Sequence, residues 1–307
     1  MISLTQSLLL IGGAVVANSI YRLLSFISFH LSASTVHRYL HGNAPYALVT
    51  GATDGIGKST AKELYKRGFN IILHGRNPEK LHRVEEELKQ LGKRDVKIWI
   101  VDASRSDIDF EKAVAQWDGL NITLVVHNVG GTTVKPERTD EISEKVLMDD
   151  VRRNATFPFF LSRAILPKLR ATSGPAGMVF IGSLSASLDL PRVVPYAATK
   201  AFVTRLSRSL GMDERFWAPT NVETSAVVIA NVVTNINTLG EGFFNPTADR
   251  FAPAMVDRFG CGRAVIVPYW PHALQIWALG LMPKWLFEKT VVKMIEENLK
   301  GKAEKQA

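Results

Sequence analysis

From residue 46 onward, short apolar runs alternate with longer segments in which apolar positions recur at helical spacing. This alternation predicts strands followed by helices, because side chains in a strand repeat every second residue and those in a helix every third or fourth. A chain built this way forms a parallel sheet with helices on both faces. The pattern predicts strands at 47–49, 70–74, 96–101, 122–126, 178–181 and 222–229, and helices at 58–66, 78–91, 107–117, 141–169 and 196–215.

The first 40 residues form a separate hydrophobic segment. Residues 8–17 are apolar or glycine throughout, and no Asp or Glu occurs before Asp54. A membrane span needs about 20 mostly apolar residues, and this segment qualifies if Arg22 snorkels to an interface. We expect residues 1–40 to be a membrane anchor; a cleaved signal peptide, a transit peptide and a buried core helix are the alternatives.

The pattern changes again after residue 240. Gly, Pro and Phe are mixed from Gly240 to Gly262, which is typical of a mobile substrate loop with a short helix. Residues 265–286 are apolar and include three tryptophans. They fit either a final strand at the edge of the core or an apolar surface that touches lipid or substrate. The tail, 289–307, is expected to be a charged helix or a frayed end.

Composition narrows the class of function. The chain has 307 residues, 46% of them hydrophobic, which suffices for one α/β domain with an appendage. The single cysteine, Cys261, excludes an internal disulfide, and no Cys/His cluster has metal-ligand spacing, so we expect no metal site. The net charge of +8 fits a membrane surface, an anionic ligand or a scattered basic surface. Because no basic run is interleaved with aromatics, we expect no nucleic-acid partner.

The segment from Thr50 to Gly57 is the most informative motif. It lies between an expected strand and an expected helix. Its glycines permit a tight turn and the close approach of a pyrophosphate, to which the helix N-terminus presents free N–H groups. In this context the motif predicts a dinucleotide site in a Rossmann-type, doubly wound sheet. The residues expected to hold the cofactor here are Gly51, Thr53, Asp54, Gly55, Ile56 and Gly57.

Three residues carry the candidate chemistry. Tyr196 and Lys200 lie four residues apart at a helix start, so they share one face. A lysine ammonium beside a phenol favours the phenolate, which should lower the pKa of Tyr196 and suit it to proton transfer at working pH. Ser183 ends the fifth expected strand, in the crevice where such sheets bind ligands. Its hydroxyl can hydrogen bond to a substrate carbonyl.

With these residues in this order, the chain resembles the short-chain dehydrogenase/reductase superfamily over about residues 46–271. We therefore expect a single catalytic domain at 41–307, in which about 240–290 form the substrate loop and an apolar C-terminal segment. The resemblance rests on the Gly-rich turn, Asn128-Val129-Gly130, Asn154, Ser183, Tyr196 and Lys200.

The resemblance implies catalytic roles. Tyr196 would be the general acid that protonates the substrate carbonyl oxygen, and Ser183 would be its hydrogen-bonding partner. Lys200 would tune Tyr196 and hold the ribose hydroxyls of the cofactor. Asn154 would bind a water that continues a proton relay from Lys200.

The resemblance also implies further cofactor contacts. Asn128 would brace the sheet, with Val129 and Gly130 against the cofactor, and Asp102 would contact the adenine amino group. The Pro-Gly pair of the family is replaced by Ile229-Ala230, which leaves the path of that loop open. The expected contacts outside the Gly-rich turn are Arg76, Asp102, Asn128, Val129, Gly130, Tyr196, Lys200, Val232 and Thr234.

Charge indicates which nicotinamide cofactor is used. An NAD-type site places an acid at the end of the second strand, but this chain has Leu73-His74-Gly75-Arg76. Arg76 can pair with a ribose 2′-phosphate, and Lys58 and His74 are expected to add to the positive field. The sequence therefore predicts NADPH/NADP+ and, in a reducing cell, the reduction of a ketone.

A narrower resemblance is to the microsomal branch that holds very-long-chain 3-oxoacyl-CoA reductases and 17β-hydroxysteroid dehydrogenases. It rests on the apolar leader, Val129-Gly130, the lost Pro-Gly pair and the segment 268–274. It implies an enzyme of the endoplasmic reticulum membrane with a cytosolic catalytic domain. The end of the chain, 302–307, carries no dilysine retrieval signal.

The substrate stays open at this level. A long-chain 3-oxoacyl-CoA is the first expectation for the hydrophobic ketone, and a steroid, polyketide or terpenoid ketone is the alternative. A non-catalytic, membrane-bound cofactor-binding scaffold is a minor alternative, because a scaffold needs neither Tyr196 nor Lys200. The family resemblance also implies a possible homodimer through the long helices after the fourth and fifth strands.

Overall fold

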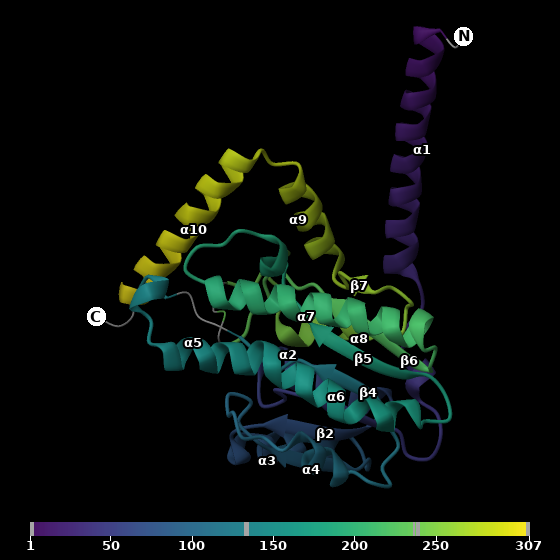
Figure 1. Cartoon of the computed structure of the whole chain (residues 1–307), viewed down its shortest axis with the longest axis vertical. Helices are drawn as coiled ribbons and strands as arrows, with labels where there is room; N and C mark the ends of the chain where they lie inside the picture. The colour runs from purple at the N-terminus through teal and green to yellow at the C-terminus, as the bar shows by residue number, and fades with distance from the viewer. Residues whose placement is uncertain (1–2, 132–134, 236, 238–239, 305–307) are drawn as a thin grey trace. The chain divides into compact units, whose positions relative to one another are not determined.

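The structure, a computed structural model, has the α/β architecture that the sequence predicts (Figure 1). It describes residues 3–131, 135–235, 237 and 240–304. The chain divides into two compact units, one up to Ser34 and one from Thr35 onward.

The first unit is the single helix α1 (Leu4–Leu31). Ser3 caps it: its hydroxyl accepts from the Gln6 N–H at 3.2 Å, and the Gln6 side chain accepts from the Ser3 N–H at 2.9 Å. Among the described residues, α1 is the one helix that is long and apolar enough to cross a membrane. Its 28 residues extend about 42 Å, more than the roughly 30 Å of a bilayer core.

The second unit is built on a seven-stranded sheet in the order β3-β2-β1-β4-β5-β6-β7, with every neighbouring pair parallel. From β1 the chain adds β2 and β3 on one side and then crosses to add β4 on the other side, so the direction of winding reverses between β1 and β4. Such a reversal opens a ligand crevice at the carboxyl ends of these strands. The Rossmann-type prediction is confirmed. The strands are β1 (Tyr46–Val49), β2 (Asn70–Gly75), β3 (Val96–Ile100), β4 (Ile122–His127), β5 (Ala176–Ile181), β6 (Val222–Val227) and β7 (Val265–Ile266).

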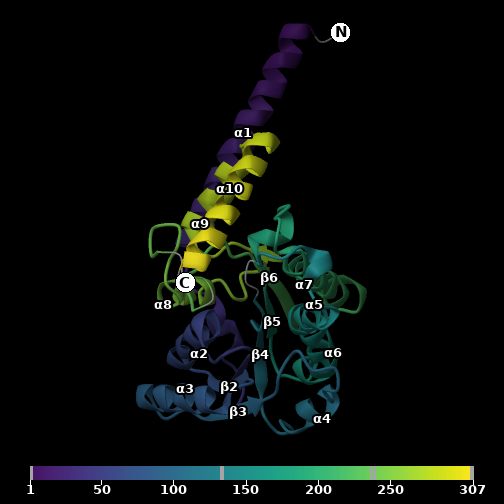
Figure 2. The ribbon, with the colours of Figure 1, turned by 90° about the vertical axis from the view of Figure 1, so that its left-hand side faces the viewer.

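Helices cover both faces of this sheet (Figure 2). On one face lie α2 (Gly55–Arg67), α3 (Pro78–Leu91) and α8 (Ala248–Val256). On the other lie α4 (Phe110–Ala115), α5 (Glu144–Val151), α6 (Phe157–Arg170) and α7 (Val194–Met212). Two helices, α9 (Trp270–Gly280) and α10 (Lys284–Glu304), follow β7. Short 3-10 turns occur at Val36–Tyr39, Thr139–Glu141 and Leu184–Ser187, and π turns at Arg152–Thr156 and Asp213–Trp217.

The core fills the space between the sheet and the helices. β1, β2, β4 and β5 are buried along their whole length, which explains why their sequences are apolar runs rather than alternating patterns. Against them pack the buried side chains of Trp99, Phe157, Leu161 and Ile165. This packing holds the ends of β1, β4 and β5 together at one edge.

The helix expected at 141–169 is interrupted. α5 ends at Val151, a π turn covers Arg152–Thr156, and α6 begins at Phe157. Pro158 has no N–H to donate to the carbonyl four residues earlier, that of Asn154, so a regular ladder of hydrogen bonds cannot pass this point. The wide turn places Asn154 at the crevice.

Other boundaries move by a few residues. α4 is shorter than the expected 107–117 because Asp109 caps it, accepting from the Lys112 N–H at 3.0 Å. β6 ends at Val227 rather than at residue 229. The segment 265–286 contains the expected final strand, β7. Tryptophans in α9 are exposed, and their contact with lipid or substrate stays a prediction.

Candidate active site

The Gly-rich turn joins β1 to α2 and is too tight for side chains. Gly51 and Gly55 have φ of +67° and +52°, values that favour glycine. A Cβ at Gly57 would lie 2.1 Å from the Gly51 carbonyl oxygen and 2.4 Å from the Asn128 side-chain nitrogen. The glycines therefore bring the turn, the helix start and the end of β4 into direct contact.

Polar side chains hold this turn from both sides. Asp54 caps α2, its Oδ1 accepting from the Gly55 N–H at 2.7 Å. Asn128 donates from Nδ2 to the Thr50 carbonyl at 3.0 Å, and its N–H donates to the Thr50 hydroxyl at 2.9 Å. Val129 lies against Gly51, since a Cβ added to Gly51 would be 2.9 Å from the Val129 Cα. Asn128 thus braces β1 against β4.

The loop after β6 reaches back to the Gly-rich turn. A Cβ on Gly55 would lie 3.1 Å from the Thr234 methyl carbon, so Thr234 lies beside the start of α2. Val232, two residues earlier, is buried. The contact places Thr234 at the crevice even though the Pro-Gly pair is absent.

Two asparagines that the sequence reasoning did not select hold this loop. The Asn235 side chain donates to the Asp54 carboxylate. The Asn237 N–H donates to the Thr234 hydroxyl at 3.1 Å, and its side chain donates to the Val232 carbonyl at 3.2 Å. Asparagine is favoured in such loops because its amide can satisfy neighbouring backbone groups, which is the signal that could have identified them.

These features fit a dinucleotide. A glycine cradle at a helix N-terminus, open to a crevice between parallel strands, is the arrangement that accommodates a pyrophosphate. Thr53 lies beside the end of β2, because a Cβ on Gly75 would be 2.6 Å from its methyl carbon. Ile56, half-buried in the first turn of α2, completes the cradle.

Arg76 and Asp102 lie together just beyond β2 and β3. The Arg76 guanidinium is exposed and its Nη1 is 3.8 Å from the Asp102 carboxylate. The other carboxylate oxygen of Asp102 accepts from the N–H and hydroxyl of Ser104 at 3.0 and 2.8 Å. Burial alone would raise the pKa of Asp102, but these hydrogen bonds and Arg76 lower it. Asp102 is therefore ionised. One of its carboxylate oxygens caps the turn at Ser104, and the other is directed towards Arg76.

The expectation that His74 strengthens the positive field is wrong in this structure, whereas the expectation for Lys58, which shares Glu87 with Lys62, stays a prediction. His74 is buried, and burial lowers its pKa to about 3, so the ring is neutral. Its Nδ1 instead accepts from the Gly51 N–H at 3.2 Å. The Lys58 ammonium is paired with Glu87 at 2.8 Å. Arg76 is the cation at the end of β2.

The candidate catalytic side chains meet at the carboxyl end of β5. Ser183 follows β5 and Tyr196 lies in the first turn of α7, and the Ser183 side chain is close enough to the Tyr196 phenol to lower its pKa. The Ser185 N–H and hydroxyl donate to the Ser183 oxygen at 3.1 and 2.9 Å, which fixes the position of that oxygen. The Lys200 ammonium donates to the Ile181 carbonyl at 2.7 Å. One strand end and one helix start therefore assemble Ser183, Tyr196 and Lys200.

The prediction that Lys200 lowers the pKa of Tyr196 is wrong for this structure. Burial raises the pKa of Tyr196, and the hydrogen bond from Ser183 lowers it by less. The Lys200 nitrogen lies 5.6 Å from the centre of the Tyr196 ring and is directed to the Ile181 carbonyl. Burial also lowers the pKa of Lys200 to about 8, so Lys200 loses its charge at a lower pH than an ordinary lysine.

Asn154 and Gly130 complete the cluster. The Asn154 Oδ1 accepts from the Gly131 N–H at 2.9 Å, and its Nδ2 donates to the Asp150 carbonyl at 2.9 Å. A Cβ on Gly130 would lie 2.6 Å from the Asn154 Oδ1 and 3.3 Å from the Lys200 Nζ. Because Gly130 has no side chain, Asn154 and Lys200 can both reach the same backbone position.

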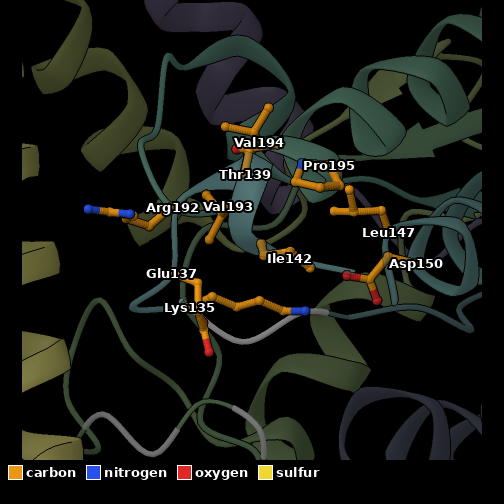
Figure 3. A pocket seen from close by; sticks show the side chains of 10 residues that line it. All are labelled: Lys135, Glu137, Thr139, Ile142, Leu147, Asp150, Arg192, Val193, Val194 and Pro195. Carbon is orange, nitrogen blue, oxygen red and sulfur yellow. The ribbon is translucent and has the colours of Figure 1, made fainter. Parts of the chain in front are cut away.

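A small pocket adjoins the cluster (Figure 3). Val193, Val194 and Pro195, directly before Tyr196, face side chains of Ile142 and Leu147 across it. Four other lining residues carry charges of both signs, Lys135, Glu137, Asp150 and Arg192, and the last is Thr139. The residues that directly precede Tyr196 in the chain therefore contribute the apolar part of this pocket's lining.

Burial of Lys200 predicts a specific pH dependence of stability. Its pKa is about 8 in the folded protein and about 10.4 when unfolded. The unfolded chain then binds more protons between these values, so the free energy of unfolding should rise with pH from about 8 to about 10, by about 3 kcal/mol. Lys200→Met should remove this dependence.

Denaturant unfolding of the wild type and Lys200→Met at pH 7 and pH 10 measures the effect. The wild type should gain stability relative to the variant at pH 10. A difference between the two proteins that is the same at both pH values would show that Lys200 keeps its ordinary pKa.

Comparison with known proteins identifies the class. The family model described as short chain dehydrogenase matches residues 45–240, the part of the chain that holds β1 to β6 and every residue of the site. The chain therefore belongs to the short-chain dehydrogenase family and is an oxidoreductase of that family.

Individual relatives agree with this assignment. The chain is 31% identical to the very-long-chain 3-oxoacyl-CoA reductase of Kluyveromyces lactis, covering 80% of this chain and 74% of the relative. It is 27% identical to the hydroxysteroid dehydrogenase-like protein 1 of Gallus gallus, covering 79% and 73%. Its fold matches a short-chain dehydrogenase from Sphingobium yanoikuyae in complex with NADPH with a TM-score of 0.64, at 23% identity over 78% of this chain and 97% of that one.

Proposed function

We propose that this protein is an NADPH-dependent reductase of a hydrophobic ketone, with a long-chain 3-oxoacyl-CoA as the substrate. The assembly of Ser183, Tyr196 and Lys200 at the end of β5, beside the glycine cradle, is the observation that carries this proposal. The relatives named as very-long-chain 3-oxoacyl-CoA reductases support the choice of substrate.

Within this proposal, a nicotinamide bound in the crevice supplies the hydride that reduces the carbonyl carbon. Tyr196 donates its phenolic proton to the carbonyl oxygen, and the raised pKa of Tyr196 keeps that proton in place until a substrate arrives. Ser183, fixed by Ser185, hydrogen bonds to the same oxygen and orients it. The two hydroxyls together stabilise the charge that develops on the oxygen.

The proton lost by Tyr196 must then be replaced. Lys200 is the nearest ionisable group, and its pKa of about 8 suits it to exchange a proton at working pH. Asn154 and Lys200 approach Gly130 at the same position, where the Asn154 amide can position a water. We propose that Lys200 and Asn154 form a proton relay that returns a proton from solvent to the Tyr196 phenolate.

The 2′-phosphate of NADPH is assigned to Arg76. Replacing Arg76 by Ala removes one charge-assisted contact, which is worth about 1.5–3 kcal/mol. The Kd for NADPH should rise about 10- to 100-fold, while the weak binding of NADH should hardly change. Lys66→Ala is the matched control, because Lys66 is exposed at the far end of α2.

Titration of both cofactors by nicotinamide fluorescence tests this assignment. Equal weakening of NADPH and NADH in Arg76→Ala would mean that Arg76 does not select the phosphate.

The proposed reaction is tested by following NADPH absorbance with the detergent-purified full chain and a long-chain 3-oxoacyl-CoA. Consumption by the wild type that is absent in Tyr196→Phe supports the proposal. If NADPH binds but neither that thioester nor any other hydrophobic ketone is reduced, the proposed reaction is wrong.

A steroid ketone is the second candidate, favoured by the similarity to a hydroxysteroid dehydrogenase-like protein; polyketide and terpenoid ketones are assayed beside it. Competition distinguishes these substrates from the thioester: the better substrate has the higher kcat/KM in a mixture. The non-catalytic scaffold predicts NADPH binding with no turnover of any ketone.

We also propose residues 1–40 as the membrane anchor and 41–307 as the catalytic domain, on the endoplasmic reticulum with the domain in the cytosol. The length and apolar composition of α1 support an anchor. A homodimer is proposed through α6 and α7, where Phe159, Phe160 and Phe202 are each about 40% exposed. Sedimentation of Phe202→Glu, which should dissociate the dimer, tests this contact.

A further inference from the structure

The α9–α10 hairpin is anchored at its base and projects at its turn. In Figure 1 the turn that joins the two helices lies far from the sheet, whereas the start of α9 lies beside the sheet. The turn comprises residues 281–283, between Gly280 and Lys284. The base and the turn therefore have different surroundings.

The base is fixed to the loop after β6. His272 is fully buried, with its Nε2 3.0 Å from the Asn231 carbonyl oxygen and 3.2 Å from that of Phe244. The Tyr269 hydroxyl donates to the Phe243 carbonyl at 3.2 Å, and the rings of Phe243 and Trp270 lie 5.0 Å apart. If the hairpin binds a surface, the loop after β6 is therefore held close to that surface as well. Val232 and Thr234 belong to the same loop.

Towards the turn, the apolar face of α9 points outward. Leu274, Trp277 and Leu281 recur at helical spacing and are 40%, 63% and 66% exposed, and Trp285, just after the turn, is 67% exposed. A helix of a soluble domain directs such a face to the core. Large exposed apolar surface of this kind marks contact with a membrane or another molecule.

The charges around the hairpin favour a lipid surface. No Asp or Glu occurs between Asp257 and Glu288, so the base, α9 and the turn carry no acidic side chain. Lys284 follows the turn directly, and Lys289 and Lys293 continue along α10. Tryptophan beside lysine is typical of the boundary between acyl chains and headgroups, where lysines are attracted to anionic lipids.

We propose that the α9–α10 hairpin is a second membrane contact, in which Trp277, Leu281 and Trp285 insert into one lipid leaflet. The 11 residues of α9 are too few to span a bilayer, which needs about 20, so the hairpin lies in the interface. Exposed tryptophan beside lysine, with no acidic side chain between Asp257 and Glu288, is the composition of a surface that contacts lipid. Lipid is therefore the occupant, and the loop after β6 faces the leaflet.

Tryptophan fluorescence allows a test that does not respond to α1, because α1 contains no tryptophan. All six lie after residue 98, at Trp99, Trp117, Trp217, Trp270, Trp277 and Trp285. The full chain is reconstituted in vesicles of phosphatidylcholine and phosphatidylserine with brominated acyl chains, which quench only tryptophans that enter the bilayer. The quenching is compared between the wild type, the double variant Trp277→Phe/Trp285→Phe, and Trp217→Phe. Trp217 is the matched control because it is 88% exposed but lies after α7.

We expect the wild type and Trp217→Phe to be quenched, and the double variant to lose most of that quenching. Leu281→Glu, which keeps every tryptophan, should also reduce it. The inference is overturned if the double variant is quenched as strongly as the wild type. It is equally overturned if the wild type is not quenched. In that case sedimentation would show whether the hairpin joins two copies of the chain instead. Because no turnover is measured, these outcomes are independent of the proposed ketone reduction.

Discussion

Replacing Tyr196 by Phe is expected to lower kcat for ketone reduction by about 10²- to 10⁴-fold, the usual contribution of a positioned general acid. The variant loses one oxygen and keeps the ring, so the pocket should keep its shape and NADPH should still bind. The loss should appear in kcat rather than in the KM for the ketone, because protonation of the carbonyl oxygen occurs in the transition state.

Tyr46→Phe is the matched control for this experiment. Its hydroxyl also makes a hydrogen bond, to Asp95 at 2.7 Å, but Tyr46 begins β1, at the end of the strand opposite the crevice. We expect Tyr46→Phe to lose some stability and to keep its kcat. Steady-state kinetics of the three proteins decide the matter: a Tyr196→Phe protein with nearly wild-type kcat would require another proton donor.

Gly57→Ala is expected to cost about 3 kcal/mol of folding stability, at the upper end of the usual range for overpacking. The added Cβ would lie 2.1 Å from the Gly51 carbonyl oxygen, and neither backbone segment can withdraw without opening the turn. The preference of helices for alanine offsets at most about 1 kcal/mol of this. The same displacement should weaken NADPH binding.

Gly280→Ala provides the comparison, because nothing lies within 4 Å of a Cβ built there. That substitution should leave stability unchanged or slightly increased. Denaturant midpoints measured at an unchanged m-value report the difference. If Gly57→Ala and Gly280→Ala unfold at the same midpoint, the turn is more compliant than its geometry indicates.

Local sequence patterns were sufficient for the order of strands and helices. They also selected Ser183, because the carboxyl ends of parallel strands meet at one edge, and Tyr196 and Lys200, because residues four apart share one helix face. Asn154 was selected by the family resemblance alone. They could not anticipate solvation. Whether Lys200 is buried depends on helices and strands distant in the sequence, and burial sets both its pKa and that of Tyr196.

The same limit explains the error around the cofactor site. His74 was expected to be charged, but Trp99 and Phe157 enclose its ring at 4.6 and 4.9 Å, and no pattern near His74 shows this. Lys58 was expected to add to the positive field, and its pairing with Glu87, 29 residues later, could not be anticipated either. Contacts between elements decide which charges a ligand meets.

The π turn before α6 has a consequence for how this chain can vary in length. A π turn holds one more residue than a regular turn, and each residue rotates a helix by about 100°. Removing one residue between Arg152 and Thr156 would therefore rotate α5 against α6. Either Leu161 and Ile165 would leave the core, or Asn154 would turn away from Gly131. The length of this helix is thus coupled to the position of one amide, and a deletion there should be tolerated only together with a compensating insertion nearby.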